Sequence, residues 1–342
     1  GISLSLLTAW QLLASFGIQW YTIARLGAGS QTDALYAGST LLQLCSAVVL
    51  DQVSVVLVPL LAAREEHERA ALAWPLFVGI GSLFALVTLL LYGVAPYLVP
   101  LMAPGFSDPT AVLAVELARI QLLGLLGAAC FTVLSALYQA RNRFLWPSGA
   151  VLISTLVGCW ILMAGLESVG VRLAAWVQVL LWCGPALLLV RALGPWSSAY
   201  MNHGAVFRDV WLRVRPLLLS AAFVRTGFVV DRFFTSFLAA GNLVLLDVTW
   251  RVMAAIVRIF NQGLVTPAVP TLATLAKNGR WQEFVRLCHA RLLWMGGGGL
   301  TASALLIAAV TLGRSFGDNL STFGVTVETL GTIQTIMLAG GG

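Results

Sequence analysis

The chain has 342 residues, of which 59% are hydrophobic and only 10% are charged, and its mean hydropathy is +0.90. A soluble domain usually carries about 25% charged residues, so the composition excludes a soluble globular protein and predicts an all-α, polytopic membrane protein. Three scattered histidines and five cysteines without paired spacing predict no metal site, disulfide or cofactor. The net charge of +6 has an explanation in membrane topology, and we expect no nucleic-acid partner.

About ten apolar segments are each close to the roughly 20 residues that a helix needs to cross a bilayer. In chain order we expect them at 3–26, 34–62, 74–102, 110–139, 145–166, 172–193, 211–238, 243–275, 292–313 and 319–339. The connection at 195–210 is the longest one. Its mixture of aromatic and basic residues is typical of a segment that lies along the membrane interface.

Basic residues are distributed unequally between alternate loops. Loops after even-numbered segments hold twelve: Arg64, Arg69, Arg141, Arg143, Arg191, Arg208, Arg213, Arg215, Lys277, Arg280, Arg286 and Arg291. Loops after odd-numbered segments hold only Arg25, Arg172 and Arg314. Because cytoplasmic loops carry the excess of Lys and Arg, this pattern predicts a cytoplasmic N-terminus.

Two short sequence matches predict an internal repeat. Leu26–Gly29 (Leu-Gly-Ala-Gly) resembles Leu238–Gly241 (Leu-Ala-Ala-Gly), and Val58–Ala62 resembles Val269–Ala273, at offsets of 212 and 211 residues. Segment 2 would then correspond to segment 8, as in a transporter made of two six-helix halves. The repeat predicts two pseudo-symmetric helical lobes.

The predicted lobes have unequal lengths. The first lobe, with six spans, occupies residues 1–194, and an interfacial connection follows at 195–210. The second lobe, at 211–342, holds only about four spans and is expected to be incomplete.

Segment 8 carries charge within an apolar helix. Asp247, Arg251, Arg258 and Gln262 share one stripe of this helix, together with Ala254, at spacings of three and four residues. An ionised arginine at membrane depth costs on the order of 3 kcal/mol. Asp247 and Arg251 could neutralise each other, but Arg258 would then stay unexplained. We therefore favour a stripe that faces a polar cavity.

Segments 2 and 7 supply further candidates for a binding site. Arg225 and Arg232 share a face of segment 7, where Asp231 could pair with either one, and the arginines of segments 7 and 8 could converge on a pyrophosphate. Asp51 is the one charge deep in segment 2 and matches Gln262 in the repeat. It is either a residue of the central space or an aspartate at a helix end.

Other charged residues and motifs do not indicate an enzyme. Glu116 and Arg119 are three residues apart near a helix end and are expected to form a local pair. The sequence has no phosphate-binding glycine loop, no Ser-His-Asp set and no zinc-protease motif. We predict no catalytic residue and no enzyme activity.

At several places the chain resembles the lipid II flippase family of the MurJ (MviN) type. The residues that carry the resemblance are Leu26–Gly29 with Asp33-Ala34, Val58-Pro59, Ala103-Pro104-Gly105-Phe106, Glu116–Ile120, Ser236-Phe237-Leu238, Gly241, Arg251 and Pro270. The family belongs to the multidrug/oligosaccharidyl-lipid/polysaccharide exporter superfamily. The resemblance therefore implies two helical lobes, alternating access, a lipid-linked substrate and a location in the bacterial inner (plasma) membrane.

The chain departs from that family where the resemblance would place anion-binding residues. Ile18 and Gln19 stand where the family has an Arg-Asp pair, and Ser39, Cys45 and Ser46 lie along a helix where it carries arginines. Of the basic residues thought to hold the pyrophosphate, Arg251 alone matches. The first lobe has thus lost most of the family's anion site.

Three functions are compatible with these features. The first is a flippase that moves an isoprenoid-pyrophosphate-linked sugar, with membrane lipid as a further partner and Arg251 and Arg258 neutralising the pyrophosphate. The second is a non-transporting relative within a complex with other membrane protein subunits, which the missing arginines favour. The third is a cation-coupled exporter of amphipathic compounds, which would depend on Asp51.

Overall fold

The computed structural model describes residues 2–194, 204–260, 280–290, 292–293, 296–297 and 301, with side chains omitted at 2–5, 205 and 255–260. The chain divides into two compact units, Gly1–Leu243 and Val244–Gly342. Each unit is considered by itself below.

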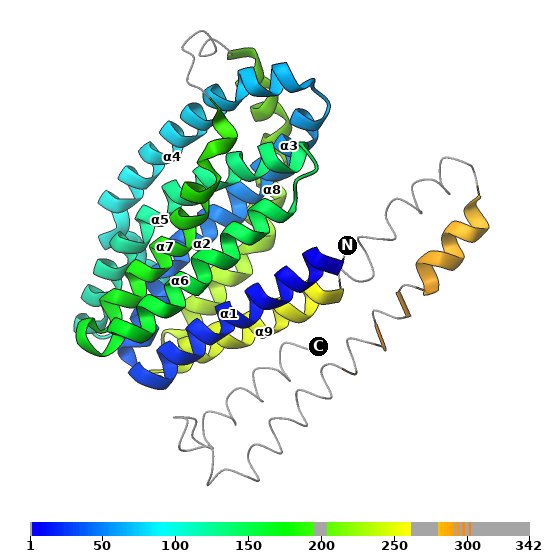
Figure 1. Ribbon diagram of the computed structural model, residues 1–342. Coiled ribbons are helices and arrows are strands. Elements are labelled where there is room, and N and C mark those ends of the chain that lie inside the picture. Colours follow the sequence, from blue (N-terminus) through cyan, green and yellow to red (C-terminus); the bar gives the residue numbers. More distant parts are fainter. Residues whose placement is uncertain are drawn as a thin grey trace. The chain divides into compact units, whose positions relative to one another are not determined.

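The first unit is a bundle of helices that run back and forth along the chain (Figure 1). Its elements are α1 (Ile2–Leu26), α2 (Ser30–Cys45), the π-helical turn η1 (Ser46–Leu50), α3 (Asp51–Ala62), α4 (Glu66–Met102), α5 (Asp108–Ala140), α6 (Leu145–Val169), α7 (Val171–Leu189), the 3₁₀ turn η2 (Val190–Leu193) and α8 (Gly204–Thr235). Helix α9 (Asn242–Phe260) begins at the end of this unit and continues into the second one.

The prediction of an all-helical membrane fold is confirmed. Within the described chain, five stretches are long and apolar enough to cross a membrane: Ser30–Ala62, Glu66–Met102, Asp108–Ala140, Leu145–Val169 and Val171–Leu193. Several helices begin before the predicted segment, as at Glu66 and Gly204. Apolar composition marks the part of a helix that crosses the bilayer, whereas the backbone stays helical through polar turns outside it.

Helix α5 lies at the centre of the first unit and packs against α2, α3, α4 and α7. Glycines allow some of these helices to approach closely. A β-carbon on Gly127 would lie 2.7 Å from Cys183 Cα, and one on Gly38 would lie 2.9 Å from Ala118 N. Small residues at helix contacts are typical of membrane bundles, where van der Waals packing replaces the hydrophobic effect.

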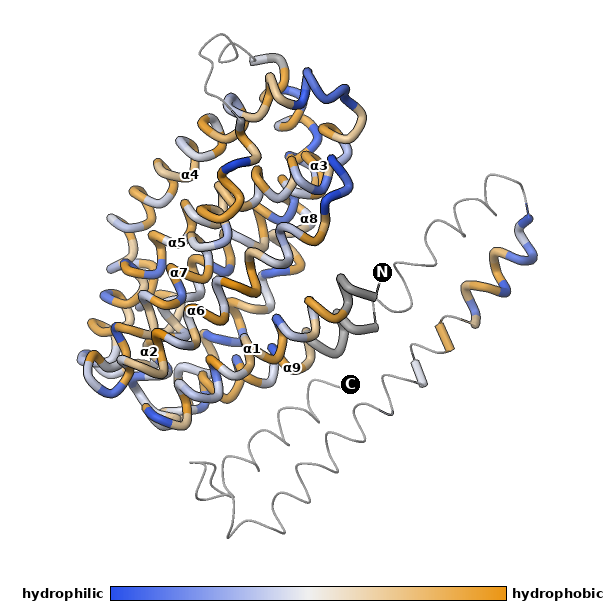
Figure 2. The backbone as a smooth tube through the Cα atoms, viewed as in Figure 1, coloured by the Kyte–Doolittle hydropathy of each residue, from blue (hydrophilic) through white to orange (hydrophobic). Residues whose placement is uncertain are grey.

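Successive turns of the first unit lie at opposite ends of the bundle (Figure 1). At one end, Arg25 pairs with Glu167 at 2.7 Å. At the other end, Arg69 reaches the Ala140 carbonyl at 2.7 Å, and Figure 2 shows hydrophilic residues where α3 turns into α4. The alternation agrees with the one used to count basic residues, and the end that faces the cytoplasm stays a prediction.

The expected pair of Glu116 and Arg119 is wrong. Glu116 instead accepts from Arg172 on α7, with an Nε–Oε1 distance of 2.7 Å. Arg119 lies over the Tyr92 ring at 5.0 Å and donates to the Tyr92 carbonyl at 3.3 Å. Packing of α5 against α7 and α4 offers each side chain a better partner than its neighbour on the same helix.

Candidate functional site

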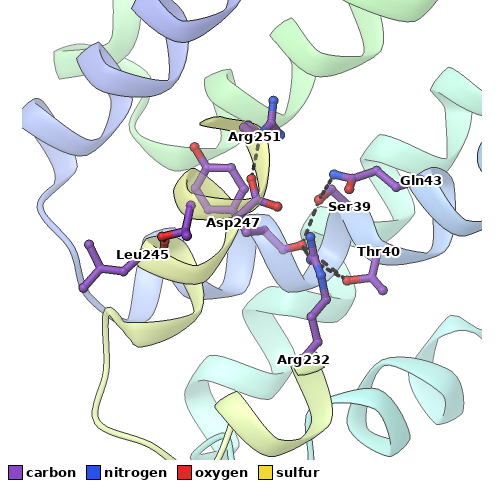
Figure 3. A network of polar contacts seen from close by, with 9 residues as sticks. Ser39, Thr40, Gln43, Arg232, Leu245, Asp247 and Arg251 are labelled. Atoms are coloured by element: carbon purple, nitrogen blue, oxygen red, sulfur yellow. Dashed lines mark hydrogen bonds and ion pairs between the residues drawn. The ribbon is translucent and has the colours of Figure 1, made fainter. Parts of the chain in front are cut away.

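Helix α8 places one guanidinium in the interior of the first unit. Arg232 is only 3% exposed, and its Nη1 donates to the Tyr36 carbonyl and to Thr40 Oγ1, the latter at 2.7 Å. Its Cζ also lies 4.2 Å from the centre of the Phe228 ring. Figure 3 shows the side chain reaching from α8 to α2. These contacts offset part of the cost of a cation in an apolar helix.

The part of α2 that receives Arg232 is locally polar. Tyr36 and Thr40 are four residues apart and share one face of the helix, and the Ser39 hydroxyl donates to the Tyr36 carbonyl at 2.8 Å. Gln43 Nε2 donates in turn to Ser39 Oγ at 2.8 Å (Figure 3). Helix α2 therefore presents hydroxyl and carbonyl oxygens to a cation without supplying a carboxylate at these positions.

An apolar cavity of about 330 Å³ lies between the same two helices. Its lining residues are Leu44, Cys45, Val48 and Val49 from α2 and η1, and Ala222, Thr226 and Val229 from α8. Leu44 on α2 and Val48 in η1 continue the four-residue spacing of Tyr36 and Thr40. On α8, the lining residues precede Arg232 at spacings of three and four. The cavity therefore continues along the faces that hold Arg232, an arrangement that suits an amphipathic anion.

A π-helical turn ends this part of the second predicted segment. Residues Ser46–Leu50 form the turn, and Asp51 follows as the first residue of α3 with an exposed side chain. A π-turn inserts an extra residue into a helix and often occurs at functional sites. The turn contains the cavity-lining Val48 and Val49 and directly precedes Asp51, the only aspartate of the predicted segment, so it is part of the candidate site.

In the second unit, Asp247 and Arg251 form the ion pair that their spacing allows. Arg251 Nε donates to Asp247 Oδ2 at 2.7 Å, with Asp247 5% exposed (Figure 3). The interpretation in which the two neutralise each other is therefore realised. Arg258 belongs to α9, but its side chain lies outside the described residues, as does Gln262 altogether.

The remaining candidates on α8 differ from Arg232 in their surroundings. Arg225 is exposed, and within the described chain the Asp231 side chain pairs with neither arginine. Of the predicted site residues, the structure thus buries Arg232 beside a cavity and joins Asp247 to Arg251. The convergence of all four arginines stays a prediction, since Arg251 belongs to the second unit.

Three connections of the first unit, those between α1 and α2, α4 and α5, and α8 and α9, form a tight contact near the start of α9. The Gly241 N–H donates to Asp33 Oδ2 at 2.6 Å, and the Gly105 N–H donates to Ser236 Oγ at 3.1 Å. A β-carbon on Gly105 would lie 2.2 Å from the Ser236 carbonyl oxygen. Gly241 has φ +96°, a conformation that favours glycine. We name these contacts the glycine clasp.

Sequence reasoning missed both the partners of Arg232 and the clasp as functional features. The four-residue spacing of Tyr36, Thr40, Leu44 and Val48 was the available signal for the first. For the second, the matched turns at Leu26–Gly29 and Leu238–Gly241 were the signal: a β-carbon on Gly241 would lie 2.7 Å from the Ala28 carbonyl oxygen. Within the described chain, no group of His, Cys, Asp and Glu could hold a metal ion.

Comparison with solved structures defines the class of protein first. A structure described as lipid II flippase MurJ in an inward closed conformation matches with a TM-score of 0.78 and 15% identity, over 99% of this chain and 72% of that chain. An inward-facing multidrug resistance MATE family transporter of the MOP superfamily matches with a TM-score of 0.65 and 14% identity, over 96% and 76%. The fold is therefore that of these membrane transporters.

A family model then identifies the family. The model described as Lipid II flippase MurJ matches residues 23–310, which is most of the chain. The protein belongs to the MurJ lipid II flippase family. The sequence-based assignment to this family is confirmed. The matched residues include Arg232, the residues that line the cavity and the glycine clasp.

Proposed function

We propose that this protein moves an isoprenoid-pyrophosphate-linked sugar, of the lipid II kind, across the bacterial inner membrane by alternating access. The observation that carries the proposal is the buried guanidinium of Arg232, which lies about one helical turn beyond Val229, a lining residue of an apolar cavity of about 330 Å³. Membership of the MurJ family supports it, as do five helical stretches that are long and apolar enough to cross a membrane. The protein acts as a transporter, without an enzymatic step.

The proposed site combines a cation with a place for hydrocarbon. Arg232 contributes to binding of the pyrophosphate, since a guanidinium can donate two hydrogen bonds to one oxyanion group. The cavity next to it receives an apolar part of the substrate. Binding is completed by the other candidates: Arg225, Arg251, Arg258, Asp247, Gln262 and Asp51.

Alternating access needs two lobes and a defined orientation. We assign the first lobe to residues 1–194, the interfacial connection to 195–210 and the second lobe to 211–342, with the N-terminus in the cytoplasm. Under this assignment the glycine clasp joins Asp33 and Gly105 of the first lobe to Gly241 and Ser236 of the second. It closes the extracytoplasmic end and opens when the substrate is released there.

Replacement of Arg232 tests the proposal most directly. We expect Arg232→Gln to lower transport about tenfold or more, because a charge-assisted hydrogen bond contributes about 1.5–3 kcal/mol. Arg215→Gln is the matched control, since it removes the same charge from an exposed position of the same helix that is not among the candidate site residues. The measurement is translocation of a fluorescent lipid II analogue in proteoliposomes, with the thermal unfolding midpoint recorded for each variant.

A second variant decides the question if Arg232→Gln does not fold. Ala222→Phe fills the cavity and leaves Arg232 in place, so we expect it to reduce translocation while the unfolding midpoint stays close to that of the wild type. Normal translocation by a folded Arg232→Gln would overturn the proposal. If that variant does not fold, normal translocation by Ala222→Phe would overturn it.

A further inference from the structure

A polar cavity lies at the end of the first unit opposite the glycine clasp. It has a volume of about 450 Å³ and is lined by Glu66, Arg69, Ala140, Arg141, Asn142 and Arg143. The first turn of α4 supplies the first two of these residues, and the turn between α5 and α6 supplies the others. We name it the arginine pocket.

The geometry of the turn explains how the arginines reach one cavity. Asn142 has φ 58°, and the Asn142 and Arg143 N–H groups donate to the Gln139 and Tyr138 carbonyls, which ends α5. Arg141 and Arg143 therefore flank a residue in the left-handed conformation. Arg69 reaches the same place from α4, because its Nη1 donates to the Ala140 carbonyl at 2.7 Å.

Positive charge in the arginine pocket exceeds negative charge. Glu66 is the one acid in its lining, and its two oxygens pair with Arg69 Nη2 at 3.0 Å and Arg141 Nη2 at 2.8 Å. Arg143 is exposed and makes no ion pair within the described part of the chain. Three guanidinium groups against one carboxylate leave a net charge of +2 around the cavity.

Two donors in the arginine pocket have no acceptor among the described residues. The Nε atoms of Arg69 and Arg141 are both buried and unpaired there. A buried N–H without an acceptor is costly, and an anion within the pocket would supply one. Charge and unmet donors thus indicate the same kind of ligand, an oxyanion.

The surface next to Arg143 indicates where that oxyanion comes from. Phe144, Leu145 and Trp146 follow directly and are exposed, and the Trp146 ring stacks on Tyr138 with 6.3 Å between ring centroids. Exposed tryptophan and tyrosine at helix ends are typical of the membrane–water interface. A ligand with a phosphate in the pocket would have its hydrocarbon beside these residues.

We propose that the arginine pocket binds the phosphodiester headgroup of an anionic phospholipid. Basic pockets between transmembrane helices are suited to such headgroups. A free phosphate carries the same oxyanion and would also fit the pocket, but the exposed apolar residues beside Arg143 favour the lipid. The site lies at the other end of the bundle from the glycine clasp and is separate from the Arg232 site, so it does not depend on the transport function.

The test measures lipid binding to the purified full-length protein. Native mass spectrometry and thermal shift are recorded with phosphatidylglycerol, with phosphatidylcholine and with inorganic phosphate. Arg143→Gln is the variant of choice, since Arg143 holds no other side chain in place among the described residues. Arg64→Gln, which removes the same charge from the neighbouring turn outside the pocket, is the matched control.

We expect phosphatidylglycerol to bind in preference to phosphatidylcholine, and Arg143→Gln to weaken its binding about fivefold. Arg64→Gln should change binding less than about twofold, because Arg64 does not line the pocket. Equal binding of the two lipids, or equal losses in the two variants, would overturn the proposal. Stabilisation by inorganic phosphate but not by phosphatidylglycerol, lost in Arg143→Gln, would also overturn the lipid assignment.

Discussion

The two ends of the first compact unit are held together by different kinds of contact. The glycine clasp relies on shape: at Gly105 and Gly241 backbone atoms approach too closely for any side chain, and Asp33 adds a hydrogen bond to a backbone N–H. The arginine pocket relies on charge, with Glu66 bridging two arginines around a cavity of about 450 Å³.

This difference has consequences for the strength and the reversibility of each contact. Close backbone packing is lost at once when a side chain is inserted, whereas exposed ion pairs contribute only about 0–1 kcal/mol and weaken in salt. The clasp therefore behaves as a contact that is either closed or open. The pocket stays in place while its ligand and ionic surroundings change.

Among the substitutions considered, we expect the one at Gly105 to destabilise its contact most. In Gly105→Ala the added β-carbon would lie 2.2 Å from the Ser236 carbonyl oxygen, and we expect the clasp to lose about 3 kcal/mol. The measurement is maleimide labelling of a cysteine placed at Ser236 in a background without the native cysteines. Labelling should be slow with Gly105 and much faster with the alanine variant.

Gly93→Ala is the matched control for this experiment. Gly93 lies within α4, and nothing would lie within 4 Å of its β-carbon. Alanine there should be neutral or slightly stabilising, since glycine is less favourable in a helix by about 1 kcal/mol. If Gly105→Ala labels as slowly as Gly93→Ala, the clasp is not closed by backbone packing.

A smaller effect is expected at Asp33. Asp33→Ala removes the acceptor for the Gly241 N–H, which is 2.6 Å from Oδ2, and a hydrogen bond to a charged group contributes about 1.5–3 kcal/mol. Asp33→Asn keeps an acceptor oxygen and should lose less. The same labelling assay and the thermal unfolding midpoint measure both variants.

Asp108→Ala controls for the position of Asp33 at a helix start. Asp108 is likewise an acid in the first turn of its helix, but it is exposed and makes no hydrogen bond or ion pair through its side chain within the described residues. Both substitutions remove a favourable interaction with the helix dipole, of about 0.3–1 kcal/mol. Equal losses in the two alanine variants would mean that Asp33 acts only on its own helix.

These features also show how far sequence reasoning extends. The helices follow from hydropathy because about 20 apolar residues must stay together in a bilayer, and Arg232 was predicted because charge in such a segment is costly. The spacing of Tyr36 and Thr40 marks the helix face that receives it, but the Tyr36 carbonyl itself was not predictable as an acceptor, because every residue has such a backbone group. The π-turn at Ser46–Leu50 likewise leaves no mark in composition.

The arginine pocket was hidden for another reason. Arg69, Arg141 and Arg143 were counted as loop residues that set the orientation of the chain, and that interpretation used their number alone. Their convergence depends on two turns that are far apart in the sequence: Arg69 and Ala140, which share a hydrogen bond across them, are separated by 71 positions. Only the packing of α4 against α5 brings these turns together.

The smallest effect on stability is expected at Glu66, where charge alone is changed. Glu66→Gln removes two ion pairs whose carboxylate is largely exposed to solvent, so we expect the free energy of unfolding to fall by less than about 1 kcal/mol. The net charge of the arginine pocket rises from +2 to +3, and its guanidinium groups lose their competing carboxylate. Binding of phosphatidylglycerol should therefore become tighter by about fivefold in low salt.

Glu68→Gln separates the effect of freeing arginines within the pocket from the effect of a higher net charge on the surface. Glu68 is exposed on the same helix and does not line the pocket, so this variant makes the same change in net charge without freeing an arginine. Its gain in affinity should be smaller than that of Glu66→Gln and should vanish at about 0.5 M salt, because exposed charges are screened over a few ångströms there. An equal gain in both variants would mean that the lipid responds to the charge of the surface and not to the pocket. A large loss of stability in Glu66→Gln would instead show that this end, like the clasp, is held by contacts that the fold requires.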